Sequence, residues 1–352
     1  MVRFSDIIGI RGKSLDKEGT SEGPAQDDKL WLSDSQMLKV RTEKGLPDVG
    51  VEERPNIETV AYYEKFLERA MEIRERVKKD QGISPSPILS DLHYLIEKDL
   101  LDAMYDYAVS APDDYEEMMV HTVDVTFASL KIGKGLDYDT RRLLQLGLAA
   151  FLENVGMYKI PENILNKKGR LEDFELAVIK NHPEVSAQIL SRMGKKYQWL
   201  ADVALQVHER ADGSGYPRGL KGQDISELAA VIGLIDTYIA MIKKRPYREK
   251  FVQADAIKFI IGETRGLFPS RILKVFLGQI SLFPVGSLVK LNNKSVGRVL
   301  STDKNQPLRP TLELLYDSLG NRVERGDVVR LAENPLLYIV GSVDDKTLGE
   351  SP

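Results

Sequence analysis

Residues 208–222 of this 352-residue chain read HERADGSGYPRGLKG. Gly213 and Gly215 permit a sharp loop, and Tyr216 supplies both an aromatic ring and a hydroxyl group. Apolar stretches with helical spacing stand on either side, at Leu200–Val207 and Leu228–Ile242. The sequence therefore predicts a glycine-rich loop that begins at a histidine and connects two helices.

The same helical spacing extends outward from this loop over residues 114–283. Loops with Gly, Pro and Asn separate the apolar stripes, and no alternating strand pattern intervenes, so we do not expect a parallel α/β sheet. The sequence predicts a mainly α chain with a helical bundle over this range. The stripes are Met118–Leu130, Leu143–Leu152, Leu176–Met193, Leu200–Val207, Leu228–Ile242 and Ala254–Ile261.

The region before the bundle, residues 56–113, also has helical periodicity. One amphipathic helix is predicted from Val60 to Val77, and a second helix is predicted from Ile88 to Met104. Ser84–Pro87 separates them, because proline lacks a backbone donor and restricts its predecessor. Such helices are typical of a dimer or docking surface, or of a cap on the next domain.

The region after the bundle, residues 284–345, changes to a period of two. Five short strands separated by turn residues predict a small β barrel or curled sheet. The predicted strands are Ser287–Leu291, Gly297–Leu300, Thr311–Leu315, Asp327–Leu331 and Leu337–Val340.

Residues 1–55 are mostly polar and predict a flexible tail or docking arm.

Composition excludes several classes of protein. The net charge of −4 without a basic run gives no electrostatic case for nucleic acid or an anionic membrane. Zero cysteines exclude disulfides, zinc–thiolate sites and cysteine nucleophiles. No apolar run approaches the roughly 20 residues of a membrane span, so we expect a cytoplasmic protein.

Three of the four histidines have neighbours that suit metal binding. A spacing of four places Glu117 and His121 on one helix face. Asp236 lies in an apolar helix, where an unpaired carboxylate is costly to bury. Imidazoles combined with carboxylates suit zinc, iron or manganese. His93 has no such neighbours and is expected to be structural. The candidate ligands are Glu117, His121, His182, His208 and Asp236.

Residues 208–222 closely resemble the signature of the bacterial HD-GYP family. Further resemblances lie at Ile160–Asn166, Asn181–Pro183, Asp236–Ala240 and Arg245–Arg248. The likeness covers roughly residues 114–283. It implies an HD-type helical bundle that holds two or three iron or manganese ions and hydrolyses cyclic di-GMP to pGpG or GMP.

Four positions depart from the family's pattern. Glu153 and Asn154 replace its His-Asp pair, Met157 replaces a lysine, and Val207 replaces the first of two adjacent histidines. A neutral Asn154 is a poor bridging ligand, Val207 deletes a ligand, and Met157 removes an ammonium group. Glu153 can still ligate. We therefore expect no metal or a single weakly held iron or manganese ion, with Glu153 added to the candidate ligands.

In the family, the glycine–tyrosine–proline loop borders the nucleotide site and contacts partner proteins. Arginines here could meet phosphate through charge-assisted hydrogen bonds; alternatively, the loop only folds the bundle and the arginines are solvated. The candidate nucleotide or partner residues are Gly215, Tyr216, Pro217, Arg218, Arg245 and Arg248.

Three hypotheses follow. The sequence favours a degenerate, non-catalytic HD-GYP protein, a signalling effector or scaffold that senses cyclic di-GMP and binds other proteins or its own copy as a homodimer. The first alternative is an active metal-dependent phosphodiesterase that uses Glu153 in a rewired site. The second alternative is a purely structural component of a larger assembly.

Overall fold

A computed structural model describes residues 57–343, except 112–115, 168, 244–252, 265, 281–282, 284, 304–305, 307 and 324–325. The predicted tail over residues 1–55 and the two candidate residues Arg245 and Arg248 lie outside the described residues. The described chain divides into two compact units, one ending at Ile280 and the other containing Phe283 and the residues after it.

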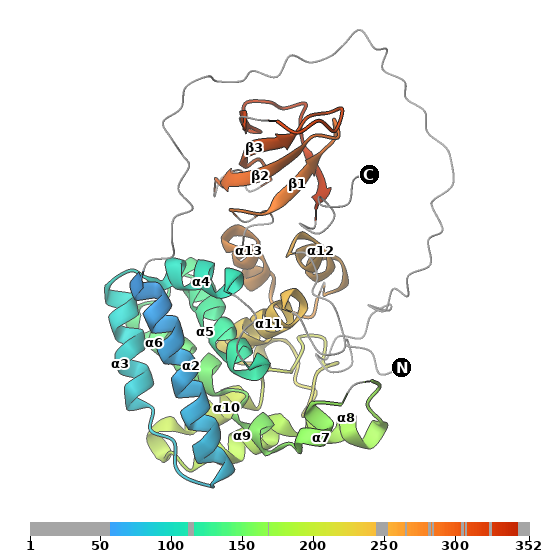
Figure 1. The fold of residues 1–352 in the computed structure, drawn as a ribbon. Helices are drawn as coiled ribbons and strands as arrows, with labels where there is room; N and C mark the ends of the chain where they lie inside the picture. The colour runs from blue at the N-terminus through green and yellow to red at the C-terminus, as the bar shows by residue number, and fades with distance from the viewer. Residues whose placement is uncertain are drawn as a thin grey trace. The chain divides into compact units, whose positions relative to one another are not determined.

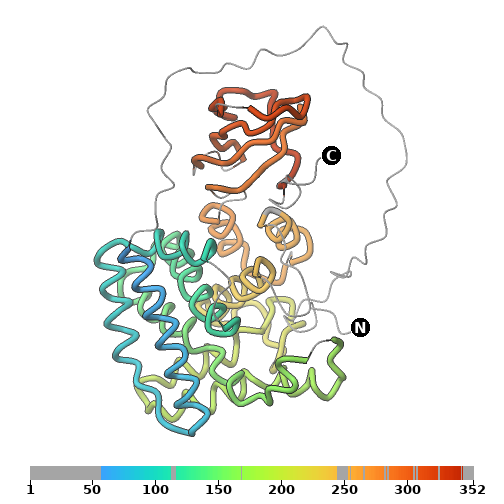
Figure 2. The backbone as a smooth tube through the Cα atoms, viewed as in Figure 1, coloured from blue at the N-terminus to red at the C-terminus, as the bar shows by residue number. Residues whose placement is uncertain are grey.

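The first unit is helical, which confirms the predicted fold class (Figures 1 and 2). Its α-helices are α2 (Ile57–Lys78), α3 (Ser86–Glu97), α4 (Leu101–Ser110), α5 (Glu117–Gly135), α6 (Thr140–Leu152), α7 (Glu162–Leu165), α8 (Asp173–Lys180), α9 (His182–Ser191), α10 (Gln198–Ala204), α11 (Glu227–Ile242), α12 (Gln253–Glu263) and α13 (Ser270–Gln279). Three short 3-10 helices are η1 (Val155–Lys159), η2 (Lys195–Tyr197) and η3 (Gly222–Asp224).

Helices α5 and α11 form the centre of this unit. Every residue from Met119 to Gly133 and from Leu228 to Ile242 is buried, which is typical of helices surrounded by other helices. Gly133 lets α6 approach α5 closely, because a Cβ atom there would lie 2.6 Å from a Leu146 methyl carbon. The two helices that carry His121 and Asp236 are therefore held from all sides.

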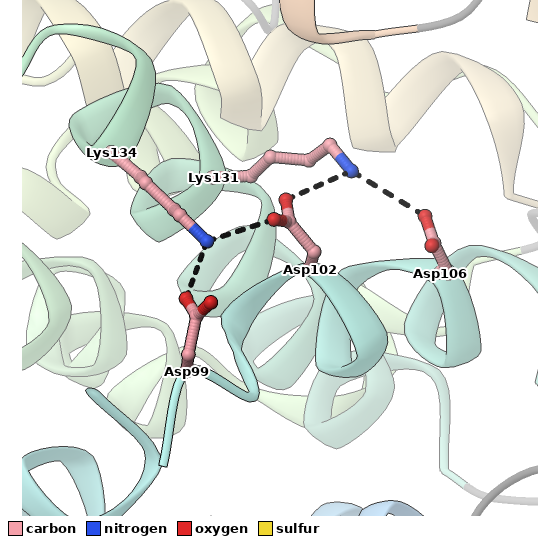
Figure 3. A network of polar contacts seen from close by, with 5 residues as sticks. All are labelled: Asp99, Asp102, Asp106, Lys131 and Lys134. Atoms are coloured by element: carbon pink, nitrogen blue, oxygen red, sulfur yellow. Dashed lines mark hydrogen bonds and ion pairs between the residues drawn. The ribbon is translucent and has the colours of Figure 1, made fainter. Parts of the chain in front are cut away.

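The predicted helix over Ile88–Met104 is wrong in one respect, because the chain forms two helices, α3 and α4. Asp99 adopts a left-handed φ of 52° between them. The turn and α4 are tied to α5 by five side chains (Figure 3). Lys134 bonds Asp99 and lies 2.9 Å from Asp102, while Lys131 lies 3.3 Å from Asp102 and 3.5 Å from Asp106.

The second unit is a five-stranded antiparallel sheet, as the period-two pattern predicts. The strand order is β4-β3-β2-β1-β5, and β5 begins two residues later than predicted. Val289, Val299, Leu312 and Val329 are almost completely buried and form its core. The strands are β1 (Leu288–Leu291), β2 (Val296–Ser301), β3 (Thr311–Tyr316), β4 (Val328–Arg330) and β5 (Ile339–Ser342).

None of the described helices is both long enough and apolar enough to span a bilayer.

A buried ion pair links three parts of the helical unit. Asp124 on α5 is fully buried, accepts a hydrogen bond from the Tyr63 hydroxyl at 2.8 Å, and lies 3.0 Å from the Lys243 ammonium. Lys243 follows α11 and also donates to the Ala108 carbonyl at 2.8 Å. Burial raises the pKa of Asp124 from 3.8 to about 6. Ionisation of this carboxyl group therefore costs more free energy in the folded protein than in the unfolded chain.

We predict that Lys243→Met lowers the free energy of unfolding by about 3 kcal/mol near pH 8, because it leaves an uncompensated buried charge. The raised pKa of Asp124 means that the native state binds a proton more tightly than the unfolded chain. The contribution of Asp124 to the free energy of unfolding is therefore fully present below about pH 4 and is lost as the pH rises through about 6. The loss in the variant should accordingly be smaller near pH 5.

Urea unfolding at the two pH values measures this difference. The matched control is Lys258→Met, since Lys258 is an exposed lysine that pairs with Asp255 at 3.3 Å; it should cost less than about 1 kcal/mol at either pH. An equal loss for Lys243→Met at both pH values would contradict the assignment of the charge to Asp124.

Candidate metal centre

His121 and Asp236 meet where α5 contacts α11. The Nε2 atom of His121 lies 2.7 Å from the Oδ1 atom of Asp236, and both side chains are buried. The structure thus explains how an apolar helix tolerates a carboxylate, because Asp236 has a polar partner.

Three further side chains converge beside this pair. One ligand atom from each of Glu153, His182 and His208 lies within 4.8 Å of the other two, and all three residues are buried. Glu153 directly follows α6, His182 is the first residue of α9, and His208 lies in the turn after α10. The structure therefore brings together residues that are 55 positions apart in the chain, from Glu153 to His208.

The histidine rings are held so that one nitrogen of each faces the other. The Nδ1 atom of His182 lies 2.7 Å from the Ile179 carbonyl oxygen, so this nitrogen carries the proton and donates it. The Nε2 atoms of His182 and His208 then lie 3.0 Å apart. A backbone carbonyl in this role is the usual orienting partner of a metal-binding histidine.

The electrostatics of the cluster favour a cation. Burial lowers the pKa of His182 to about 4 and that of His208 well below its usual range, so both imidazoles are neutral, the form that binds metals. Burial and the nearby Asp236 carboxylate raise the pKa of Glu153 well above its usual range. An ionised Glu153 therefore needs positive charge close by.

Two buried atoms of the cluster also lack hydrogen-bond partners among the described residues. They are the Oε2 atom of Glu153 and the Nδ1 atom of His208. Unpaired buried acceptors are costly, and a bound ion would offset the cost at Glu153. The two imidazoles and the Glu153 carboxylate form a donor set that suits iron, manganese or zinc. The residues present thus fit a divalent transition metal.

The other substituted positions contribute no ligand to the three-residue cluster. The Asn154 amide donates a hydrogen bond to Glu153 Oε1. Met157 packs against an apolar group of Ile160, Ile164 and Ile179. Val207 is 1% exposed and lies in the core.

Glu117 occupies the first turn of α5 and is partly exposed. It is not part of the cluster of Glu153, His182 and His208.

The loop after His208 is held by a residue that the sequence analysis did not single out. The Glu209 carboxylate accepts hydrogen bonds from the backbone N–H groups of Arg218 at 2.7 Å and Leu220 at 2.9 Å. A Cβ atom at Gly215 would lie 2.4 Å from Glu209 Cα, so only glycine fits there. Pro217 follows a cis peptide bond, and the Arg218 side chain is exposed.

Tyr216 stacks on His208, a residue of the candidate metal centre. Its ring is parallel to the His208 ring, with 4.9 Å between the centroids and 3° between the planes. The ammonium group of Lys180, the last residue of α8, lies over the Tyr216 ring at 5.5 Å from its centroid. Lys180 is a second residue that sequence reasoning missed, since only the loop's fold brings it there.

Comparisons with known proteins find similar domains in both parts of the chain. The HD domain family matches residues 107–268, and a KOW domain associated with HD domains matches residues 288–351. A cyclic di-GMP phosphodiesterase of Pseudomonas aeruginosa is 32% identical over 206 residues, which are 58% of this chain and 49% of the relative. A cyclic di-GMP phosphodiesterase of Borreliella burgdorferi is 27% identical over 209 residues, 59% of this chain and 55% of the relative.

The chain thus spans about half the length of these curated relatives. A solved structure of an HDG"Y"P protein from Bdellovibrio bacteriovorus is 20% identical, with a TM-score of 0.47, and the match covers 64% of this chain and 72% of that one. On the family match, the curated relatives and the motifs at residues 160–166, 181–183 and 208–222, the helical unit of this chain contains an HD domain of the HD-GYP family.

Proposed function

We propose that this chain is a metal-dependent phosphodiesterase that hydrolyses cyclic di-GMP at a rewired centre. One observation carries the proposal: Glu153, which replaces a histidine of the family pattern, lies in the same cluster as His182 and His208. The substitution therefore preserves a metal ligand. The two curated relatives, both cyclic di-GMP phosphodiesterases, support the substrate class.

Each residue of the centre has a role that its contacts support. Glu153, His182 and His208 would hold the metal, together with the Asp236 carboxylate. A divalent ion bound there would polarise a phosphoryl oxygen and lower the pKa of water. His121 fixes the orientation of Asp236, and the Ile179 carbonyl fixes the ring of His182. Tyr216 covers one face of His208 and limits the access of solvent to it.

A non-catalytic effector that binds cyclic di-GMP is the second candidate. Asn154 and Met157 favour it, because a neutral amide does not bridge two metal ions and a thioether in an apolar cluster supplies no cation for phosphate. In that case the nucleotide would bind and remain intact. A purely structural component, the third hypothesis, would bind no nucleotide.

We predict that the protein binds about one manganese ion per chain and that Glu153→Gln weakens this binding by at least about 10-fold, since the amide removes the anionic ligand. Metal analysis after dialysis gives the stoichiometry, and calorimetry gives the affinity. The control is His93→Gln, because His93 is half exposed on α3 and faces only Glu97 at 3.5 Å. Equal affinities of the Glu153 variant and the wild type would contradict the proposed ligand.

We predict that the manganese-loaded protein converts cyclic di-GMP to linear pGpG and that Glu153→Gln abolishes this conversion without unfolding the chain. Anaerobic incubation followed by chromatography of the bound and free nucleotide tests it, with His93→Gln as the active control. Intact nucleotide in the bound fraction would instead identify the non-catalytic effector. Absence of bound nucleotide would favour the structural component.

A further inference from the structure

Two side chains, one of them from the candidate metal centre, contact the ring of Tyr216. The His208 ring stacks on one face of the Tyr216 ring. The Lys180 ammonium lies over the same tyrosine, at 5.5 Å from the ring centroid. The His208 ring and the Lys180 ammonium therefore contact the same tyrosine ring, so a positive charge stands close to a residue of the candidate metal centre.

Lys180 also lies next in the chain to Ile179, the residue whose carbonyl contacts His182. It ends α8, and the neighbouring residue Ile179 accepts the hydrogen bond of His182 Nδ1 at 2.7 Å. Ile179 itself is 7% exposed and packs in the apolar cluster with Ile160 and Ile164. The end of α8 is thus anchored on two sides, which limits the movement of the Lys180 backbone.

Lys180 differs from nearby lysines in having no anionic partner among the described residues. Lys167 lies 2.6 Å from Glu175, and Lys159 lies 2.8 Å from Asp80. Within the part of the chain that the structure describes, the Lys180 ammonium contacts the Tyr216 ring. The Lys180 side chain is partly exposed, so its ammonium is available to an anionic ligand.

We propose that Lys180, held across the Tyr216 ring, binds the second phosphate of a cyclic dinucleotide while the first phosphate lies at the metal centre. This inference rests on the proposed function. A cyclic dinucleotide carries two phosphodiester groups in one covalent ring, so a site that takes one of them also meets the other a short distance away. A lysine ammonium is a compact charge that binds phosphate without a fixed hydrogen-bond geometry.

A different role for Lys180 is a simple cation–π contact that stabilises the tyrosine. The chain offers a matched example, because the Lys196 ammonium lies 5.4 Å from the centroid of the Tyr197 ring. That contact involves η2 and none of the residues of the metal centre. Lys196→Met is therefore the control for the loss of such a contact by itself.

The test compares two ligands on the manganese-loaded protein: cyclic di-GMP, with two phosphodiesters, and bis(p-nitrophenyl) phosphate, with one. Dissociation constants are measured by rapid mixing, before hydrolysis consumes the ligand, for the wild type, Lys180→Met, Lys180→Arg and Lys196→Met, and thermal melting verifies that each variant is folded. We expect Lys180→Met to reduce the preference for cyclic di-GMP over the single phosphodiester about 10-fold, the size of one lost charge-assisted hydrogen bond.

Three further results are expected. Lys180→Arg should restore most of the preference, because it keeps the charge, and Lys196→Met should leave it unchanged. The affinity of the wild type for cyclic di-GMP should fall with added salt more steeply than that of Lys180→Met, since one fewer ion contact remains in the variant.

Either of two outcomes overturns the inference. If Lys180→Met weakens both ligands equally or neither, Lys180 does not recognise a second phosphate, while the proposed function stands. If the metal-loaded wild type binds no cyclic di-GMP, the proposed function fails and this inference fails with it. The two failures are thus told apart by the wild-type measurement alone.

Discussion

His121 and Asp236 meet at 2.7 Å between two helices whose other residues are buried almost throughout. Apolar packing alone would allow such helices to slide or rotate with little change in buried area. A buried polar pair is satisfied in one register only, because a shift of either helix leaves a carboxylate or an imidazole without its partner. The position of Asp236 beside Glu153, His182 and His208 follows from that register.

The Asp124–Lys243 pair adds a second polar connection between the same part of α5 and the chain just after α11. His121 and Asp124 are three residues apart on α5 and therefore share a face of that helix. Asp236 and Lys243 are seven apart, close to two helical turns. The two contacts together resist rotation of α11 about its axis more strongly than either contact alone. The candidate metal centre thus lies beside two buried polar contacts that connect α5 with α11 and the residue after it.

Much of this arrangement could be predicted from the sequence, and the misses have physical causes. Helical periodicity predicts the bundle, the period of two predicts the five strands, and His182, His208 and Asp236 were candidate ligands from the sequence alone. The break at Asp99 was missed because an aspartate in the left-handed region leaves the apolar pattern of α3 and α4 uninterrupted. Lys180 was missed because its partner, Tyr216, is 36 residues away and a cation over a ring has no sequence signature.

The substitutions at Glu153 and Asn154 make physical sense as a pair. The family pattern places a neutral imidazole before an anionic carboxylate, whereas this chain places an anionic carboxylate before a neutral amide. The formal charge of the pair is therefore the same. Had Asp been retained at position 154, three carboxylates would stand close together with Asp236, and like charges in a buried site disfavour ionisation.

Asn154 instead donates a hydrogen bond to Glu153. That bond stabilises the ionised form of Glu153, whose other oxygen has no partner among the described residues. The exchange moves the anionic ligand by one position while holding the net charge of the centre constant. Burial opposes ionisation of Glu153, so its carboxylate becomes charged at low cost only beside a cation, and this is the physical argument that favours the proposed metal despite the changed motif.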